Sequence, residues 1–250
     1  MTPQSLAQAR NYADWARTCA EKSQNKAKII IVPSFVYLSE IAGLLKRTKV
    51  KLGAQDVFWE NSGTYTGEIS SKMLKNLGVE YVIVGHSERR KFLDETDEMI
   101  NKKVLAALKA GLKVILCIGE IERTTNNKQL TTQEKNFVKK QLEKDLKGIK
   151  KLLGVGRKSL VSNLAIAYEP VWAIGAGRSD TPEDAAEMIK FIKSLIVNHF
   201  SLITPVLYGG SVDSKNIKNF IQYKEIDGVL VGHASLKRGE IKKIIKSISK

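Results

Sequence analysis

Leu164-Ala165-Ile166-Ala167-Tyr168-Glu169-Pro170-Val171-Trp172-Ala173-Ile174-Gly175-Ala176-Gly177-Arg178 is the stretch of sequence that decides the fold. It begins with five apolar or aromatic residues, a run typical of a buried strand in a parallel sheet. The acid Glu169 follows at the carboxyl end of that strand, where α/β folds place ligands and chemistry. Pro170 then stiffens the chain, and Gly175 and Gly177 free the backbone of the next loop. The pattern indicates an active-site base beside a water-excluding lid, the alternative being that Glu169 merely ends a strand.

The same strand-then-helix pattern recurs along the whole chain. Helices are expected between the strands, for example over Asp97–Ala110 and Thr181–His199. The predicted strands are Lys28–Val32, Val50–Ala54, Tyr81–Gly85, Val114–Ile118, Leu164–Tyr168, Pro205–Tyr208 and Gly228–Val231. A repeated β-α unit with short loops predicts a parallel sheet that closes on itself.

The chain opens on a helix rather than a strand. Thr2-Pro3 supplies a cap and a first helical position. A stripe at helical spacing follows, formed by Leu6, Ala9, Ala13, Ala16 and Ala20. Seven strands cannot close a barrel of this kind without leaving two strand edges unpaired. Either the first strand lies outside this sequence, or the sheet is open.

Length and composition indicate one domain over residues 1–250. A chain of 250 residues, 43% hydrophobic and 27% charged, can bury a sizeable core. It has no apolar run long enough to span a bilayer and no signal peptide, and two cysteines do not make a disulfide framework. These features exclude membrane-spanning and disulfide-stabilised classes and favour the cytoplasm.

The formal net charge of +15 points to anionic partners, from phosphorylated metabolites to nucleic acid. Most lysines, however, fall in helical stretches such as Lys135–Lys151 and Lys237–Lys250, between apolar positions. They do not gather with aromatic residues or form a recognisable nucleic-acid module. We therefore expect a solvated basic surface, with neither nucleic acid nor membrane as a partner. A nucleic-acid-binding protein is the alternative that rests on charge alone.

Four predicted strands end at polar or glycine-rich loops. These loops are His86-Ser87-Glu88-Arg89-Arg90, Gly119-Glu120, Gly209-Gly210-Ser211 and Gly232-His233-Ala234-Ser235. Glycine-rich turns after the last two strands of such barrels bind phosphate through backbone N–H groups and a helix N-terminus. The sequence therefore predicts a base, a histidine and an anion site on one face.

These residues resemble the triosephosphate isomerase family. The likeness runs from Val32-Pro33-Ser34-Phe35 to Val231-Gly232. It is most specific in Tyr65-Thr66-Gly67-Glu68-Ile69-Ser70, in Gly85-His86-Ser87-Glu88-Arg89-Arg90 and in Tyr168 to Gly175. The resemblance implies a (β/α)8 TIM barrel and an intramolecular isomerase of glycolysis and gluconeogenesis. Its reaction would interconvert D-glyceraldehyde 3-phosphate and dihydroxyacetone phosphate without metal or organic cofactor.

The resemblance also implies roles for individual residues. Glu169 would be the base that moves a proton between two carbons, and His86 would polarise the carbonyl oxygen. The helix start at His86 favours a neutral imidazole, an effect for which this family is the standard example. Glu88 would lie next to these two side chains without contacting the substrate itself. The phosphate would be held by Gly175, Ser211, Gly232 and the backbone of His233.

Two further expectations concern the loop Asn61–Ser70 and Cys117. The resemblance implies a homodimer in which Asn61–Ser70 enters the neighbouring subunit's site. Cys117 lies inside a predicted strand, so we interpret it as a packing residue rather than a nucleophile.

Two positions depart from the family's pattern. No residue here matches the Asn-x-Lys segment that ends the family's first strand, whose lysine steadies the substrate's negative charge. The sequence also has Gly232-His233 where the family has Gly-Gly. If that backbone needs a positive φ, histidine costs about 1–2 kcal/mol; otherwise its N–H still binds and an imidazolium adds charge.

The absence of a match to the Asn-x-Lys segment gives an expectation for the 250-residue chain by itself. Unless a strand ending in Asn-x-Lys precedes Met1, the chain is expected to fold loosely and to turn over poorly. The alternative to an active isomerase is therefore an N-terminally truncated, catalytically impaired remnant of the same family.

Overall fold

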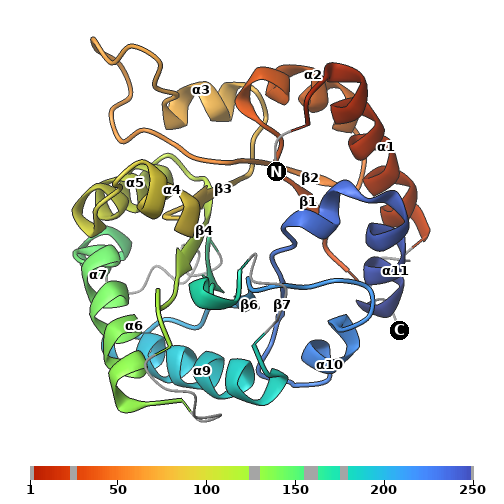
Figure 1. Cartoon of the computed structure of the whole chain (residues 1–250). Helices are drawn as coiled ribbons and strands as arrows, with labels where there is room; N and C mark the ends of the chain where they lie inside the picture. Colours follow the sequence, from red (N-terminus) through yellow and green to blue (C-terminus); the bar gives the residue numbers. More distant parts are fainter. Residues whose placement is uncertain (1–2, 23–26, 124–129, 155–162, 175–179, 249–250) are drawn as a thin grey trace.

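The centre of the protein is a curled parallel sheet. The structure is a computed structural model that describes residues 3–22, 27–123, 130–154, 163–174 and 180–248 (Figure 1). Its seven strands follow one another in chain order across the sheet. They are β1 (Ile30–Ile31), β2 (Lys51–Ala54), β3 (Tyr81–Val84), β4 (Lys113–Ile118), β5 (Leu164–Tyr168), β6 (Val206–Tyr208) and β7 (Gly228–Val229). Each lies at a predicted strand, so the seven strand predictions are confirmed.

The strand register places the site residues side by side. Ile118 of β4 pairs with Tyr168 of β5, and Tyr168 pairs with Tyr208 of β6. The next residue along each strand therefore falls in one row at the carboxyl edge of the sheet, with Glu169 between two glycines. Backbone hydrogen bonds continue into this row, from Glu169 N to the Ile118 carbonyl at 2.8 Å and from Gly209 N to the Tyr168 carbonyl at 2.7 Å.

Successive residues of each strand face opposite sides of the sheet. One side forms a cluster inside the curl, made of Tyr81, Ile83, Ile115, Cys117 and Ala167. The other side packs against the helices in the larger core, as Val82 and Val84 of β3 do. Both sides are covered, which explains why the strands read as continuous apolar runs.

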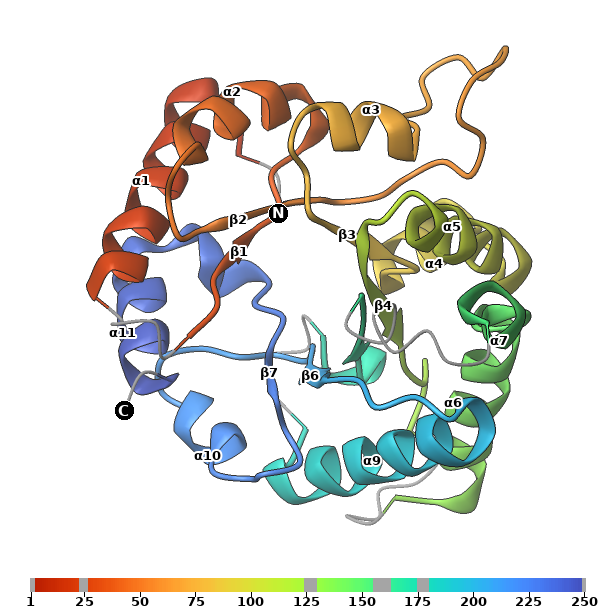
Figure 2. The ribbon, with the colours of Figure 1, turned by 180° about the vertical axis from the view of Figure 1, so that it is seen from behind.

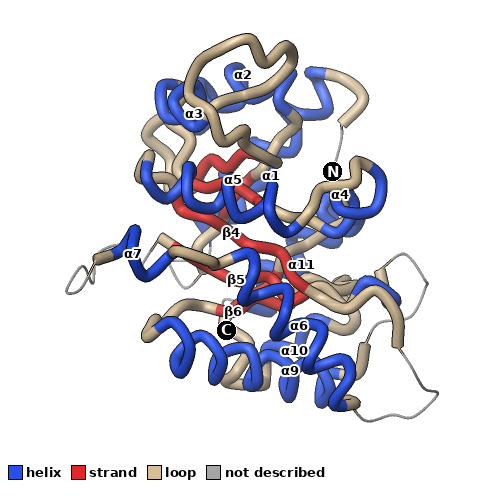
Figure 3. Tube along the Cα trace, turned by 90° about the vertical axis from the view of Figure 1, so that its left-hand side faces the viewer, coloured by secondary structure: helices blue, strands red, loops and turns tan. Residues whose placement is uncertain are grey.

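Helices surround the sheet (Figures 1 and 2). In the side view of Figure 3, α5 and α6 lie in front of the strands and α9 lies below them. The helices are α1 (Leu6–Lys22), α2 (Phe35–Leu45), α3 (Ser71–Asn76), α4 (Ser87–Phe92), α5 (Asp97–Lys109), α6 (Thr132–Asp145), α7 (Ile149–Leu153), α9 (Pro182–Leu195), α10 (Ile217–Ile221) and α11 (Arg238–Ile248). A 3-10 turn, Val171–Ala173, follows β5, and a π-helical turn, Ile196–Phe200, continues α9. The helices predicted over Asp97–Ala110 and Thr181–His199 are confirmed.

Helix α1 begins at Leu6, so the predicted start at Thr2-Pro3 is wrong. The cap is Ser5, whose hydroxyl accepts a hydrogen bond from Gln8 N at 3.2 Å. Thr2 lies outside the described residues. The alanines of the predicted stripe are buried, whereas Leu6 is exposed; the buried ones are Ala9, Ala13, Ala16 and Ala20.

The ring of helices closes, but the sheet does not. In the described part of the chain, β1 pairs with β2 and β7 pairs with β6, and no pairing joins β1 to β7. Helix α1 packs against both α2 and α11 and so spans this interval on the outside. The described residues therefore form a curled sheet with a gap between β1 and β7, as both alternatives from the sequence expect.

The lysine-rich stretches form outer helices. In α6, Val138 and Leu142 are buried, and in α11, Ile244 is buried while Lys242 and Lys243 are exposed. This arrangement agrees with a solvated basic surface. Among the described residues, no helix combines the length and the apolar character that a bilayer span requires.

Candidate active site

The carboxylate of Glu169 is buried at the carboxyl edge of the sheet. Its side chain is 2% exposed, and Oε1 lies 3.2 Å from Nε2 of His86. Oε2 accepts a hydrogen bond from the backbone N–H of Ser87 at 2.9 Å. Oε1 has no hydrogen-bond partner among the described residues. A desolvated carboxylate oxygen with free lone pairs can accept a proton from a bound molecule.

Two glycines make room for Glu169. A Cβ on Gly119 would lie 1.7 Å from the carbonyl oxygen of Glu169, and one on Gly209 would lie 2.9 Å from its Cγ. Any larger residue at Gly119 must therefore displace the backbone that carries the acid. The sequence predicted both loops, but it did not show that their glycines pack against Glu169.

His86 is the N-cap of α4, and its ring orientation is fixed by its own helix. Nδ1 accepts a hydrogen bond from Glu88 N at 3.3 Å. A nitrogen that accepts this bond carries no proton, so a neutral ring carries its hydrogen on Nε2, the nitrogen beside Glu169. The Glu88 carboxylate lies 3.8 Å from Nδ1 and is 67% exposed, on the side of the ring away from Glu169.

A buried ionic cluster holds α4 from behind. Arg89 contacts Asp56 at 2.8 Å and Glu95 at 2.6 Å, and Lys103 contacts the same two carboxylates. Burial raises the pKa of Asp56, while Lys103 lowers it. Because each charge has at least two opposite partners, the cluster fixes α4 against α5 and the chain after β2.

Cys117 is fully buried in β4 and lies in the cluster inside the sheet. Burial, and then the neighbouring Glu169 carboxylate, raise the pKa of its thiol well above the ordinary value. A thiol held protonated in an apolar environment is unreactive. The interpretation of Cys117 as a packing residue is confirmed.

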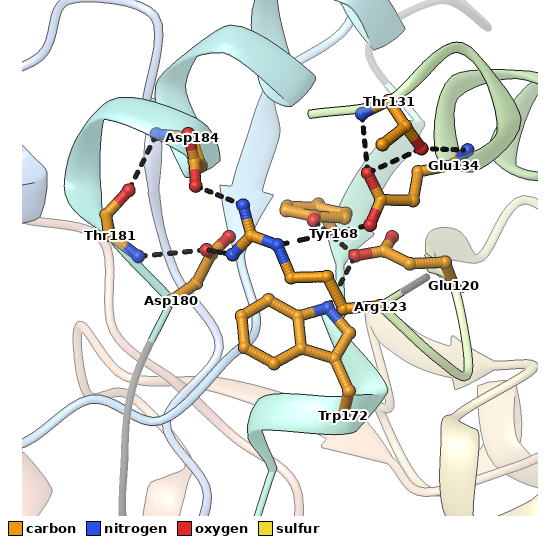
Figure 4. A network of polar contacts seen from close by, with 9 residues as sticks. All are labelled: Glu120, Arg123, Thr131, Glu134, Tyr168, Trp172, Asp180, Thr181 and Asp184. Carbon is orange, nitrogen blue, oxygen red and sulfur yellow. Dashed lines mark hydrogen bonds and ion pairs between the residues drawn. The ribbon is translucent and has the colours of Figure 1, made fainter. Parts of the chain in front are cut away.

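Glu120 joins the end of β5 to the turn that follows it (Figure 4). Its Oε1 accepts hydrogen bonds from the Tyr168 hydroxyl at 2.9 Å and from the Trp172 indole at 2.8 Å. Burial raises the pKa of Glu120, and these two donors lower it. The contacts fix the residues on either side of Glu169-Pro170.

Arg123 extends this network to the start of α9 (Figure 4). Its guanidinium lies 4.8 Å from the centre of the Trp172 ring and 3.2 Å from Asp180, and it also pairs with Asp184. Burial raises the pKa of Asp180 to about 7, although Arg123 opposes this shift. The Thr181 hydroxyl caps α9 by accepting a hydrogen bond from Asp184 N at 3.1 Å. Gly175, predicted to bind phosphate, lies outside the described residues.

The other predicted phosphate-binding residues follow β6 and β7. Ser211 is exposed, and its carbonyl accepts a hydrogen bond from Asn216 at 3.0 Å. His233 begins a 3-10 helix, His233–Leu236, and is not among the residues with positive φ. Histidine therefore causes no left-handed strain here, which decides between the two possibilities for Gly232-His233. Because the sheet is parallel, both loops leave it at the edge that carries Glu169.

Sequence reasoning placed His86 and Glu169 on one face but missed the buried charges behind them. The motif containing Arg89 and Arg90 was recognised without a role for either arginine. One local signal of a buried charge was available in the sequence. Lys103 follows Ile100 by three residues and precedes Ala107 by four, which places it on the buried face of α5. The partners of these charges are distant in sequence, so the pairing itself requires the fold.

Comparison with known proteins gives an independent finding. The family model described as triosephosphate isomerase matches residues 3–248. A protein named triosephosphate isomerase from Caldanaerobacter subterraneus subsp. tengcongensis is 44% identical over 228 residues, which are 88% of this chain and 86% of that protein. One of the same name from Dictyoglomus thermophilum is 43% identical over 253 residues, covering 94% of this chain and 97% of that protein.

The packing of Gly119 against Glu169 gives a testable prediction. Gly119→Ala should lower the free energy of unfolding by about 3 kcal/mol or more, because the methyl group overlaps backbone rather than a movable side chain. Urea denaturation measures this. Gly43→Ala in α2 is the matched control, since a Cβ at Gly43 meets nothing within 4 Å. Equal stabilities of the two variants would contradict the packing.

Proposed function

This chain belongs to the triosephosphate isomerase family, and on that premise we propose that Glu169 and His86 carry the proton transfers of its reaction. The chain is an isomerase of triose phosphates, which interconverts D-glyceraldehyde 3-phosphate and dihydroxyacetone phosphate in glycolysis and gluconeogenesis. One observation supports the assignment most strongly: Glu169 Oε1 is buried, lacks a hydrogen-bond partner among the described residues, and lies 3.2 Å from His86 Nε2.

The proposed first step is removal of a proton from the carbon next to the carbonyl. Glu169 Oε1 accepts this proton, and the electron pair moves toward the carbonyl oxygen to give an enediolate. Oε2 keeps its hydrogen bond to Ser87 N and so holds the carboxylate in place. Return of the proton to the neighbouring carbon completes the isomerisation.

The proposed role of His86 is to bind the developing oxygen charge. Its Nε2–H points into the site because Nδ1 is occupied by the N–H of Glu88. A hydrogen bond from Nε2 to the substrate oxygen stabilises the enediolate, and proton exchange through Nε2 equalises the two oxygens. Glu88 acts through His86, since its N–H fixes the ring and its carboxylate lies on the Nδ1 side.

The substrate phosphate is proposed to lie over the loops after β6 and β7. Gly232 and the backbone N–H of His233 offer donors there, and Ser211 offers an exposed backbone and hydroxyl. The His233 side chain is exposed, so in its protonated form it adds positive charge beside the phosphate. Gly175 completes the proposed set from outside the described residues.

We also propose a homodimer, in the cytoplasm, assembled through Asn61–Ser70. This segment extends away from the ring of helices between β2 and α3 (Figures 1 and 2). Residues 61–68 are exposed, while Phe58 and Ser71 close its base through hydrogen bonds to Ile69 and Asn61. Sedimentation velocity should show a species of twice the chain mass of 27.8 kDa; a monomer would contradict the proposal.

Glu169→Gln should lower kcat about a hundred-fold or more with little change in KM, because the amide cannot accept the proton but can still accept the bond from Ser87 N. A coupled assay on both triose phosphates measures this. Glu122→Gln, which removes an exposed carboxylate nearby, should leave the rate unchanged. A Glu169→Gln variant with more than about a tenth of the activity would contradict the assignment, and absence of turnover in the unsubstituted chain would favour the impaired remnant.

His233→Gly should raise KM by about two- to ten-fold with kcat nearly unchanged, because the backbone N–H remains and only the side-chain charge is lost. Steady-state kinetics measure it. A fall in kcat at constant KM would instead assign His233 a direct role in the chemistry.

A further inference from the structure

Arg90 of α4 uses one guanidinium to join four parts of the barrel. Its Nε donates to the carbonyl of Gly85 at 2.8 Å, and its Nη2 donates to the carbonyl of Cys117 at 3.2 Å. Its Nη1 binds Asp97 at 2.7 Å, and Nη2 also binds Asp145 at 2.6 Å. The side chain is mostly buried.

The two carbonyls lie at the carboxyl ends of β3, which His86 follows, and of β4, which pairs with the strand that Glu169 follows. Gly85 follows β3 and directly precedes His86. Cys117 lies one residue before the carbonyl that accepts the N–H of Glu169, and its thiol lies beside the Glu169 carboxylate. Arg90 is therefore bonded to both strand ends but not to His86 or Glu169 themselves.

The turn at Gly85 is shaped around the guanidinium. Gly85 has a φ of +74°, and a Cβ there would lie 3.0 Å from Arg90 Nη2. A planar group with five donors can bind acceptors in several fixed directions at once. A lysine ammonium in the same place can reach only some of them.

Asp145 anchors the far side of the guanidinium. Its side chain is fully buried at the end of α6, and Asn101 holds its backbone through hydrogen bonds to the carbonyls of Asp145 and Lys147, at 2.9 and 2.8 Å. Burial raises the pKa of Asp145 to about 7, while Arg90 opposes that shift. The position of Arg90 is thus fixed from behind by α5 and α6.

We propose that Arg90 is a positioning residue for the isomerisation, which sets the separation of His86 and Glu169 by bonding the backbone of β3, which His86 follows, and of β4, whose Ile118 carbonyl accepts the N–H of Glu169. The proposal rests on the proposed roles of His86 and Glu169. Arg90 touches neither the substrate nor the reacting atoms. A displacement of about 1 Å between two reacting groups lowers a rate about a hundred-fold, so backbone bonds at this place act on kcat rather than on substrate affinity.

Arg89→Lys is the matched control, because Arg89 lies on the same helix and pairs with two buried carboxylates but, among the described residues, donates no hydrogen bond to a strand-end carbonyl. Arg90→Lys should lower kcat about ten- to hundred-fold with KM changed less than about three-fold, and Arg89→Lys should lower kcat much less. Free guanidinium ion should restore part of the rate of Arg90→Ala. Equal effects of the two lysine variants, or a change confined to KM, would overturn the proposal.

A second readout does not depend on turnover. The chain has three histidines, so the 15N signals of the His86 ring can be assigned by comparison with His86→Gln. These signals should shift in Arg90→Lys and not in Arg89→Lys, and unchanged signals would overturn the proposal. Where Arg90→Lys does not fold, Arg90→Gln takes its place in both measurements. Absence of turnover in the unsubstituted protein would contradict the proposed function, while the NMR result would still decide the role of Arg90.

Discussion

The burial of one carboxylate is the constraint on which the site depends. Glu169 has only 2% of its side chain exposed, and an ionised acid loses hydration there that the protein must replace. Oε2 receives a backbone N–H from Ser87, whereas Oε1 is left without a hydrogen bond among the described residues. The residues around Glu169 suit a buried acid. Gly119 and Gly209 leave space for its backbone and side chain, and the thiol of Cys117 beside it is neutral.

Buried ion pairs help to hold the chain segments on either side of Glu169. Arg90 and Arg123 each pair with a carboxylate whose pKa burial raises to about 7, Asp145 and Asp180 respectively. Acids whose pKa is raised in the folded state bind more protons there than in the unfolded chain between about pH 4 and 7. Ionisation in that window therefore lowers stability. These pairs serve to define the geometry more than to add stability.

The sequence predicted the strands well because each is a short apolar run buried on both faces, and the register then brought the strand-end loops together. It also predicted that His86 and Glu169 share one face, because β3 and β5 end at the same edge of a parallel sheet. It failed at the start of α1, where Thr2-Pro3 and Ser5 are both plausible caps and the helix begins after Ser5, whose hydroxyl accepts the N–H of Gln8. The buried pairs could not be predicted, because Arg90 and Asp145 are 55 residues apart and neither departs from ordinary surface composition.

The central claim is that a single buried base moves a proton between two carbons of the substrate through an enediolate. The most direct test is isomerisation of either triose phosphate in D2O, with NMR analysis of the product. A proton held on Glu169 exchanges with solvent before it returns, so the account predicts deuterium on the carbon that receives it. Product that contains no deuterium at that carbon even after the two triose phosphates have been equilibrated through many turnovers in D2O would contradict the account.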